Sequence, residues 1–118
     1  MQIINTSESF HTTIASPELT IAVFKADWCG DCKYIDPFMP EVESHYADRL
    51  RLVEVDVDGV GDVSQEQNIM GIPSFVAYAN GKELIRFVNK ARKSRQEIEQ
   101  FLDRAVEVYN TLNAQTAE

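Results

Sequence analysis

Apolar and polar positions repeat along this chain with two periods, and each period predicts one kind of element. Residues 19–26 form an almost continuous apolar run with β-branched members, which is typical of a strand covered on both faces. In residues 50–57, valines alternate with Glu54 and Asp56, which predicts a second strand. Residues 2–4 add a short third candidate. The first half of the chain is thus expected to supply strands to one sheet.

Between these strands, apolar residues recur at helical spacing. The spacing predicts helices over residues 7–15, 30 to about 46, and 62–68. In the longest of them, Tyr34, Phe38 and Val42 share one stripe. Pro37 is expected to kink this helix, because proline has no amide hydrogen to donate.

The second half of the chain begins with a hairpin signal. Two apolar runs, residues 74–79 and 84–88, are separated by an Asn80-Gly81 pair. Asparagine and glycine tolerate the positive φ angles that a type I′ turn requires at both central positions. We therefore expect two antiparallel strands joined by a tight turn.

The last predicted element is a helix. It opens with a capping box between Ser94 and Glu97, and apolar residues continue at helical spacing as far as Leu112. The order of elements is then β–α–β–α–β–β–α, with a short strand in front. This order predicts an α/β fold whose central mixed sheet has a parallel core and an antiparallel C-terminal hairpin, with helices on both faces. We expect one domain over residues 1–118, with a frayed tail from about residue 113.

Composition narrows the function classes. The chain has 118 residues, a net charge of -8 and 44% hydrophobic residues, which argues against nucleic-acid binding and is typical of a globular protein. No apolar run approaches the length of about 20 residues that crosses a bilayer, and the first ten residues do not resemble a secretory signal. We expect a cytoplasmic monomer without nucleic-acid or membrane partners. A domain of this length needs no disulfide staples, so its two cysteines are available for chemistry.

Both cysteines lie in the segment Trp28-Cys29-Gly30-Asp31-Cys32-Lys33, where an expected strand meets an expected helix. A thiolate at a helix N-terminus is stabilised by unpaired backbone N–H groups and by the helix dipole. A second thiol one turn further along can attack a mixed disulfide formed by the first. The spacing therefore predicts dithiol–disulfide chemistry.

The chain resembles the thioredoxin family from Leu19 to Leu102. The matching residues are Ala26-Asp27-Trp28-Cys29-Gly30-Asp31-Cys32-Lys33, then Pro37, then Gly71-Ile72-Pro73 before the hairpin. The resemblance implies a thioredoxin fold, with Cys29 as the attacking thiol and Cys32 as the resolving thiol.

The resemblance also implies a substrate-binding surface and a set of partners. Pro73 would be cis and face the thiols, the Ile72 backbone would pair with a bound substrate strand, and Gly30 would lie within the site. Trp28 is expected to be a partly exposed platform beside Cys29. The substrates would be disulfide-containing proteins or small thiols. A separate reductase or thiol would return the electrons, and the Cys29–Cys32 disulfide would make a bound cofactor unnecessary.

Two departures from the family pattern fall near the thiols. Asp31 stands where thioredoxins usually have proline; its charge favours the helix N-terminus but disfavours a thiolate at Cys29, so we expect it to modulate the acidity of the thiols. Lys25 and Lys33 could offset part of this charge. The resemblance also implies a buried carboxylate that assists the resolving thiol, and its place is taken by Val23.

Glu54, on the adjacent expected strand, is the nearest replacement for that carboxylate. The simpler interpretation is a solvated strand residue, since carboxylates are usually exposed. We keep Glu54 as a candidate proton relay.

A third departure is the basic loop, residues 89–95, where thioredoxins have a small glycine-containing loop. Four of the eleven basic residues lie in it, at a helix N-terminus where positive charge is unfavourable. Asn89, Lys90 and Arg92 are therefore candidate substrate contacts for an acidic partner or a small anionic thiol. A solvated face is the competing interpretation.

Two other functions remain open at this point. A thioredoxin-fold module could bind a partner without catalysis, and it would then keep its interaction after both thiols were removed. Alternatively, two chains could pool their cysteines around a metal ion or an iron–sulfur cluster, which colour and metal content would reveal. Within one chain, His11 and His45 lack ligand spacing with the cysteines, so no mononuclear metal site is expected.

Overall fold

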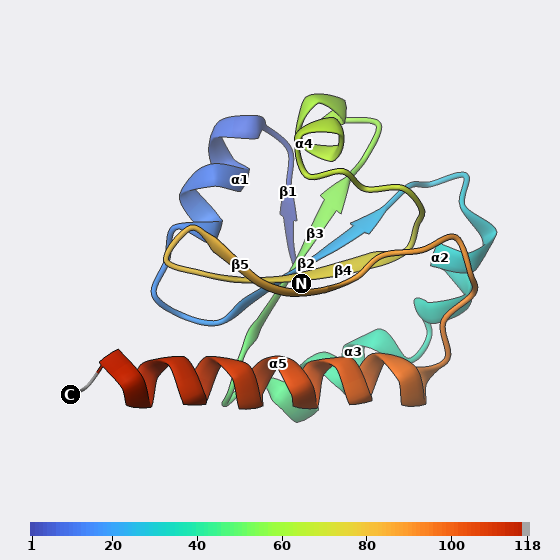
Figure 1. Ribbon diagram of the computed structural model, residues 1–118. Helices are drawn as coiled ribbons and strands as arrows, with labels where there is room; N and C mark the ends of the chain where they lie inside the picture. The colour runs from blue at the N-terminus through green and yellow to red at the C-terminus, as the bar shows by residue number, and fades with distance from the viewer. Residues whose placement is uncertain (117–118) are drawn as a thin grey trace.

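The computed structural model describes residues 1–116 and contains one five-stranded mixed sheet (Figure 1). Its strands are β1 (Gln2–Ile4), β2 (Thr20–Lys25), β3 (Arg51–Asp56), β4 (Ser74–Ala79) and β5 (Lys82–Phe87), in the spatial order β1-β3-β2-β4-β5. β1, β3 and β2 are parallel, whereas β4 is antiparallel to both β2 and β5. The predicted parallel core with an antiparallel C-terminal hairpin is confirmed.

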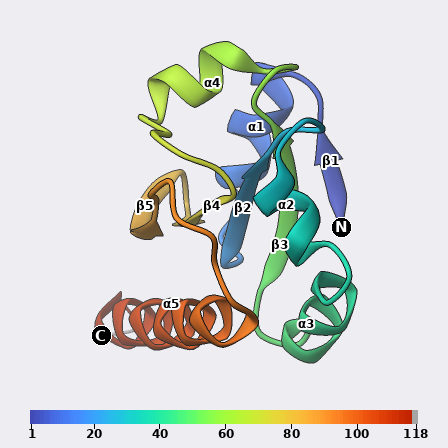
Figure 2. The same ribbon diagram turned by 90° about the vertical axis from the view of Figure 1, so that its right-hand side faces the viewer.

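Helices cover both faces of the sheet (Figures 1 and 2). α1 (Ser7–Ile14) and α4 (Gly61–Glu66) lie on one face, and α3 (Met39–Tyr46) and α5 (Arg95–Thr116) lie on the other. α2 (Gly30–Ile35) follows β2 and lies beyond the end of that strand. None of these helices is long and apolar enough to cross a membrane.

The alternation of side chains along β2 divides the interior into two cores. Ile21 and Val23 pack toward α3 and α5, whereas Ala22 and Phe24 pack toward α1 and α4, and all four are fully buried. This confirms the prediction of a strand covered on both faces. Because successive side chains alternate, Lys25 points to the same face as Val23, at the end of the strand.

The helix expected over residues 30–46 is two helices. α2 ends at Ile35 and α3 begins at Met39, with Pro37 in the turn between them. Proline cannot donate the amide hydrogen that a continuous helix requires at its position, and its ring clashes with the preceding turn. The interruption leaves α2 as a short helix whose N-terminus carries the cysteines.

The stripe expected along this helix is only partly correct. Val42 is fully buried and Phe38 is half-buried, but Tyr34 is 45% exposed. The break at Pro37 changes the rotational register, and Ile35 takes the interior position instead.

The two turn and cap signals are confirmed. Asn80 and Gly81 have φ angles of 56° and 78°, as a type I′ turn requires. At the start of α5, the Glu97 amide donates to Ser94 Oγ (3.1 Å) and the Ser94 amide donates to Glu97 Oε1 (3.0 Å). α5 continues to Thr116, and the last two residues of the expected frayed tail, 117–118, lie outside the described part of the chain.

Candidate active site

The two cysteines occupy the first turn of α2, and the structure has both as free thiols. Cys29 is the N-cap residue, and its sulfur accepts a hydrogen bond from the backbone amide of Cys32 (3.2 Å). Its thiol in turn donates to the carbonyl oxygen of Ile72 (3.7 Å). A sulfur that accepts an amide hydrogen bond at a helix start is well placed to carry negative charge.

Cys32 is in a different environment from Cys29. It is 1% exposed, against 6% for Cys29, and it packs with Ala26 and Ile72. Burial, together with a hydrogen bond to Cys29, raises the pKa of Cys32 well above its usual range. Cys32 therefore remains a thiol at neutral pH, and Cys29 is the better candidate for the attacking group.

The Ile72–Pro73 peptide bond is cis, as the resemblance implies. Ile72 is half-buried against both cysteines, so the segment before Pro73 forms one wall of the site. A β-carbon added to Gly71 would lie 2.3 Å from the carbonyl oxygen of Asn89. Glycine at this position therefore allows the 89–95 loop to approach the Gly71-Ile72-Pro73 segment.

Two large apolar side chains are exposed in segments that flank these residues. Trp28 is 68% exposed, and its indole Nε1 donates to Asp58 Oδ2 (2.7 Å). Met70, which the sequence analysis did not single out, is 71% exposed and precedes Gly71. No periodic pattern marks an exposed methionine in a loop, so only its place beside the Gly-Ile-Pro motif could have drawn attention to it. Gly30 is open, with no atom within 4 Å of an added β-carbon.

The charge of Asp31 is paired with a residue that lies far away in the sequence. Arg92 Nε donates to Asp31 Oδ1 (2.9 Å), and the Arg92 guanidinium lies over the Tyr34 ring, 4.4 Å from its centroid. The sequence analysis expected Lys25 and Lys33 to offset part of this charge, and it did not include Arg92. Lys25 pairs elsewhere, and the compensating charge comes from the basic loop.

The basic loop is less exposed than its composition predicts. Lys93 is 1% exposed, and its ammonium donates to Ala91 O (2.9 Å), Asn89 Oδ1 (3.1 Å) and Asn89 O (3.2 Å). Burial lowers the pKa of Lys93 below its usual value. Arg95 is held by Glu41 and Glu99, each at 3.1 Å. The competing interpretation of a solvated face does not hold for Lys93, which is buried, whereas Arg95 is paired but remains partly exposed.

The remaining candidates of this loop stay at the surface. Lys90 is exposed, and the Arg92 side chain is 60% exposed although it pairs with Asp31. Asn89 is exposed as well, and its side-chain oxygen also accepts the Ala91 amide (2.9 Å), which fixes the loop conformation.

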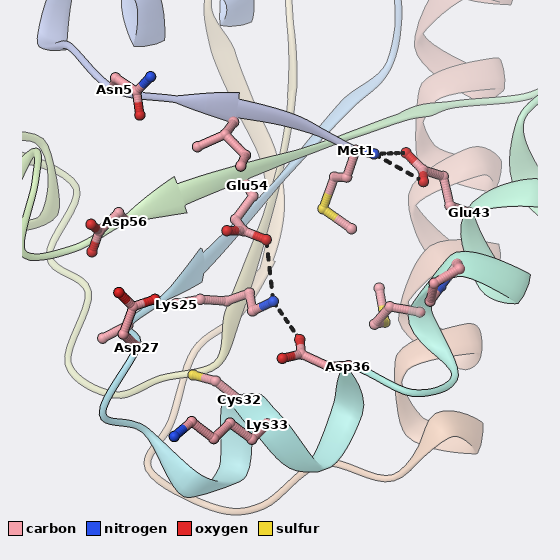
Figure 3. Close-up of a pocket in the computed structure, with 14 residues that line it drawn as sticks. Met1, Asn5, Lys25, Asp27, Cys32, Lys33, Asp36, Glu43, Glu54 and Asp56 are labelled. Carbon is pink, nitrogen blue, oxygen red and sulfur yellow. Dashed lines mark hydrogen bonds and ion pairs between the residues drawn. The ribbon is translucent and has the colours of Figure 1, made fainter.

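Cys32 also lines a cavity of about 570 Å³ (Figure 3). Glu54, the candidate proton relay, lines it together with Cys32 and Lys25. The Lys25 ammonium donates to Glu54 Oε1 (3.2 Å) and to Asp36 Oδ1 (2.5 Å). Val23, which pairs with Glu54 across the sheet, is fully buried and cannot exchange a proton. The structure thus puts Glu54 in the same cavity as Cys32.

The described residues contain no group of three or more histidine, cysteine, aspartate or glutamate side chains arranged to hold a metal ion. The arrangement of two thiols at a helix N-terminus instead suits the formation and cleavage of a disulfide.

Comparisons with known proteins agree with this chemistry. The thioredoxin family model matches residues 1–104. Thioredoxin 1 of Plasmodium falciparum is 37% identical over 84 residues, which cover 71% of this chain and 80% of the relative. Thioredoxin-1 of Saccharomyces cerevisiae is 34% identical over 83 residues, covering 70% and 80%. A solved structure of Plasmodium falciparum thioredoxin superposes with a TM-score of 0.78 at 31% identity and covers 88% of this chain and 98% of that one. The chain therefore belongs to the thioredoxin family, and it is a protein-disulfide oxidoreductase.

Proposed function

We propose that this thioredoxin reduces a restricted set of protein or low-molecular-weight disulfides, with Cys29 as nucleophile and Cys32 as resolving thiol. The observation that carries the proposal is the contrast between the two sulfurs. Cys29 caps α2 and accepts the Cys32 amide at 3.2 Å, whereas Cys32 is almost completely buried. Cys29 Sγ is therefore placed to carry negative charge and to attack the substrate. Cys32 Sγ is placed to react only after Cys29 has formed a mixed disulfide.

The proposed cycle has two exchanges. The Cys29 thiolate attacks one sulfur of the substrate disulfide, and the other sulfur leaves as a thiolate. Cys32, after losing its proton, attacks Cys29 Sγ; the bond between Cys29 and the substrate breaks, and the second substrate thiolate leaves. Two electrons have then passed to the substrate, and Cys29 and Cys32 form a disulfide.

No bound cofactor takes part, because in thioredoxins the redox-active disulfide belongs to the polypeptide. Members of the family are regenerated by thioredoxin reductase. For this chain, a separate reductase or a low-molecular-weight thiol fills that role in our proposal. We also propose that the protein is a monomer and works in the cytoplasm. In that compartment both cysteines would be kept reduced between turnovers.

The surface around Cys29 would bind the substrate. The cis peptide before Pro73 leaves the half-buried Ile72 beside the thiols, and we propose that its backbone pairs with an extended substrate segment. Trp28 and Gly30 would supply apolar contact and open space on the motif side. In this arrangement the substrate approaches Cys29 from the side opposite the cavity behind Cys32.

The restriction to particular substrates would come from charge. Asn89, Lys90 and Arg92 form the exposed part of the basic loop, in a protein whose net charge is -8. Arg92 is tied to Asp31 of the redox motif, so a partner that reaches Cys29 also meets this loop. Charges at the rim of an interface act mainly on the association rate. An acidic partner or a small anionic thiol fits them.

One experiment tests the mechanism and the partner together. Cys32→Ser should trap substrates as mixed disulfides on Cys29, and a pull-down from the native cell would identify them. Trapping by Cys29→Ser, which keeps Cys32, and none by Cys32→Ser would contradict the assignment of the nucleophile. An interaction that survives loss of both thiols would indicate a non-catalytic binding module.

A second experiment tests the basic loop. Lys90→Glu should slow the reaction with the trapped partner at low salt, and added salt should reduce the difference because exposed charges are screened within about 10 Å at 0.1 M. Lys82→Glu, an exposed position on β5, makes the same change of charge away from the loop and is the matched control. If the two variants react with the partner at equal rates, the basic loop does not select substrates and is only a solvated face.

A further inference from the structure

The second exchange of the cycle needs a thiolate at Cys32, and the surroundings of this sulfur oppose it. Cys32 is 1% exposed, and burial raises its pKa. The interior position on β2 that could have supplied a carboxylate is Val23, which packs in the apolar core. Another part of the molecule must therefore lower the free energy of the charged sulfur during this step.

The cavity behind Cys32 contains the groups that could do so. Lys25, at the end of β2, lines this cavity of about 570 Å³ together with Cys32, and its side chain is 15% exposed. Its ammonium lies between the carboxylates of Glu54 on β3 and Asp36 directly after α2, at 3.2 and 2.5 Å (Figure 3). The Lys25 ammonium is thus held in the cavity that Cys32 also lines.

Several elements place charged groups around this cavity. They are Lys25 and Asp27 at the end of β2, Lys33 and Asp36 from α2 and the residue after it, Glu54 and Asp56 from β3, and the Met1 amine paired with Glu43 at 3.2 Å. Among them, Lys25 is held by two carboxylates, and these raise its pKa although burial alone would lower it. Lys25 therefore stays charged over the pH range in which thiols react.

We propose that Lys25 is a positioning residue for the resolving step: its tethered ammonium stabilises the Cys32 thiolate and holds Glu54 in the cavity to receive the thiol proton. The inference rests on the proposed dithiol cycle. Cys32 loses its proton to the Glu54 carboxylate, attacks Cys29 Sγ and forms the internal disulfide. The departing substrate thiolate takes up a proton from solvent, and Glu54 returns its proton to solvent through the open cavity. A cation near a sulfur favours the thiolate, and the field of Lys25 at Cys32 acts against the effect of burial.

A two-phase assay separates the steps. When reduced protein is mixed with dithiobis(nitrobenzoate), attack by Cys29 releases one coloured thiolate and resolution by Cys32 releases the second. Lys25→Met should leave the first phase within about twofold, slow the second at least tenfold near pH 7, and shift its pH profile upward. Lys25→Arg should restore most of the second rate, since it keeps a positive charge.

The control is Lys33→Met, which removes the same charge from an exposed position on the same cavity. It should not shift the pH profile of the second phase. Glu54→Gln, which removes the proposed proton acceptor and one of the two tethers of the ammonium, should also slow the second phase. An unchanged second phase in this variant would overturn the proposal even if Lys25→Met does not fold.

The outcomes distinguish this inference from the proposed function. An unchanged second phase in Lys25→Met, an equal slowing of both phases, or an equal shift in Lys33→Met would overturn the role of Lys25. Absence of the first phase in the unmodified protein would instead contradict the proposed function.

Discussion

Gly71→Ala should destabilise the protein, because the position is closed by backbone. A β-carbon there would lie 2.3 Å from Asn89 O, 2.5 Å from Asn89 C and 2.7 Å from Lys90 N. Ordinary contacts of a β-carbon begin at 3.4 Å, so the loop would have to retreat by about 1.1 Å from its closest atom. No rotation of a side chain can relieve this clash, since the three atoms belong to the main chain.

The retreat also disturbs Lys93. Its buried ammonium donates to two oxygens of Asn89, at 3.1 and 3.2 Å, and these move with the loop. Overpacking costs about 1–3 kcal/mol, and a buried donor left without its partner costs about 1–3 kcal/mol. Because part of the strain relaxes, we expect Gly71→Ala to lower the free energy of unfolding by about 2–4 kcal/mol.

Urea unfolding followed by circular dichroism measures this change, and the chain offers a matched control. Gly61 is the first residue of α4 and has no atom within 4 Å of an added β-carbon. Gly61→Ala should therefore be neutral or stabilising by up to about 1 kcal/mol, since alanine loses less conformational entropy on folding. If Gly71→Ala stays within about 0.5 kcal/mol of the unmodified protein, the loop does not press against Gly71 and the reasoning fails.

Three further predictions concern the thiols, Lys93 and the hairpin. Iodoacetamide should label Cys29 before Cys32, since Cys32 is buried with a raised pKa; mass spectrometry showing the reverse order would contradict the assignment. Lys93→Met should be more stable than the unmodified protein at pH 7, because burial disfavours the charged ammonium. The difference should shrink as pH rises toward the unfolded pKa of about 10.5, because the folded protein releases this proton at a lower pH than the unfolded chain does. A difference independent of pH between 7 and 10.5 would refute this. Gly81→Ala should cost about 1–2 kcal/mol, since the residue has φ of 78°, and an unchanged urea midpoint would count against the turn.

The sequence predicted those features that depend on local signals. Asn80-Gly81 and the Ser94–Glu97 box act within four residues, and both form the expected turn and cap. The spacing of the cysteines likewise predicted two thiols at the start of one helix. Pro37 marked a disturbance in the right place, but its consequence was a complete break, since the chain can turn there and restart a helix at Met39.

Charges were predicted less well, because their environment depends on distant segments. Asp31 and Arg92 are 61 residues apart, and no periodicity links them. From the sequence, Lys93 resembles a surface cation because its neighbours are basic. In the structure the loop folds so that three oxygens accept hydrogen bonds from its ammonium. Composition reveals how many charges a segment has but not which of them face solvent.

The two departures from the family pattern near the thiols have a common physical feature. Asp31 would place a negative charge beside Cys29, and Arg92 from the basic loop pairs with it. Beside Cys32, the carboxylates of Asp36 and Glu54 are paired with the ammonium of Lys25. Since a carboxylate near a sulfur disfavours its thiolate, pairing each with a cation limits this penalty in a chain of net charge -8. In the proposed cycle this pairing would allow the two thiols to ionise in turn, and replacing Lys25 should separate the two steps of the exchange.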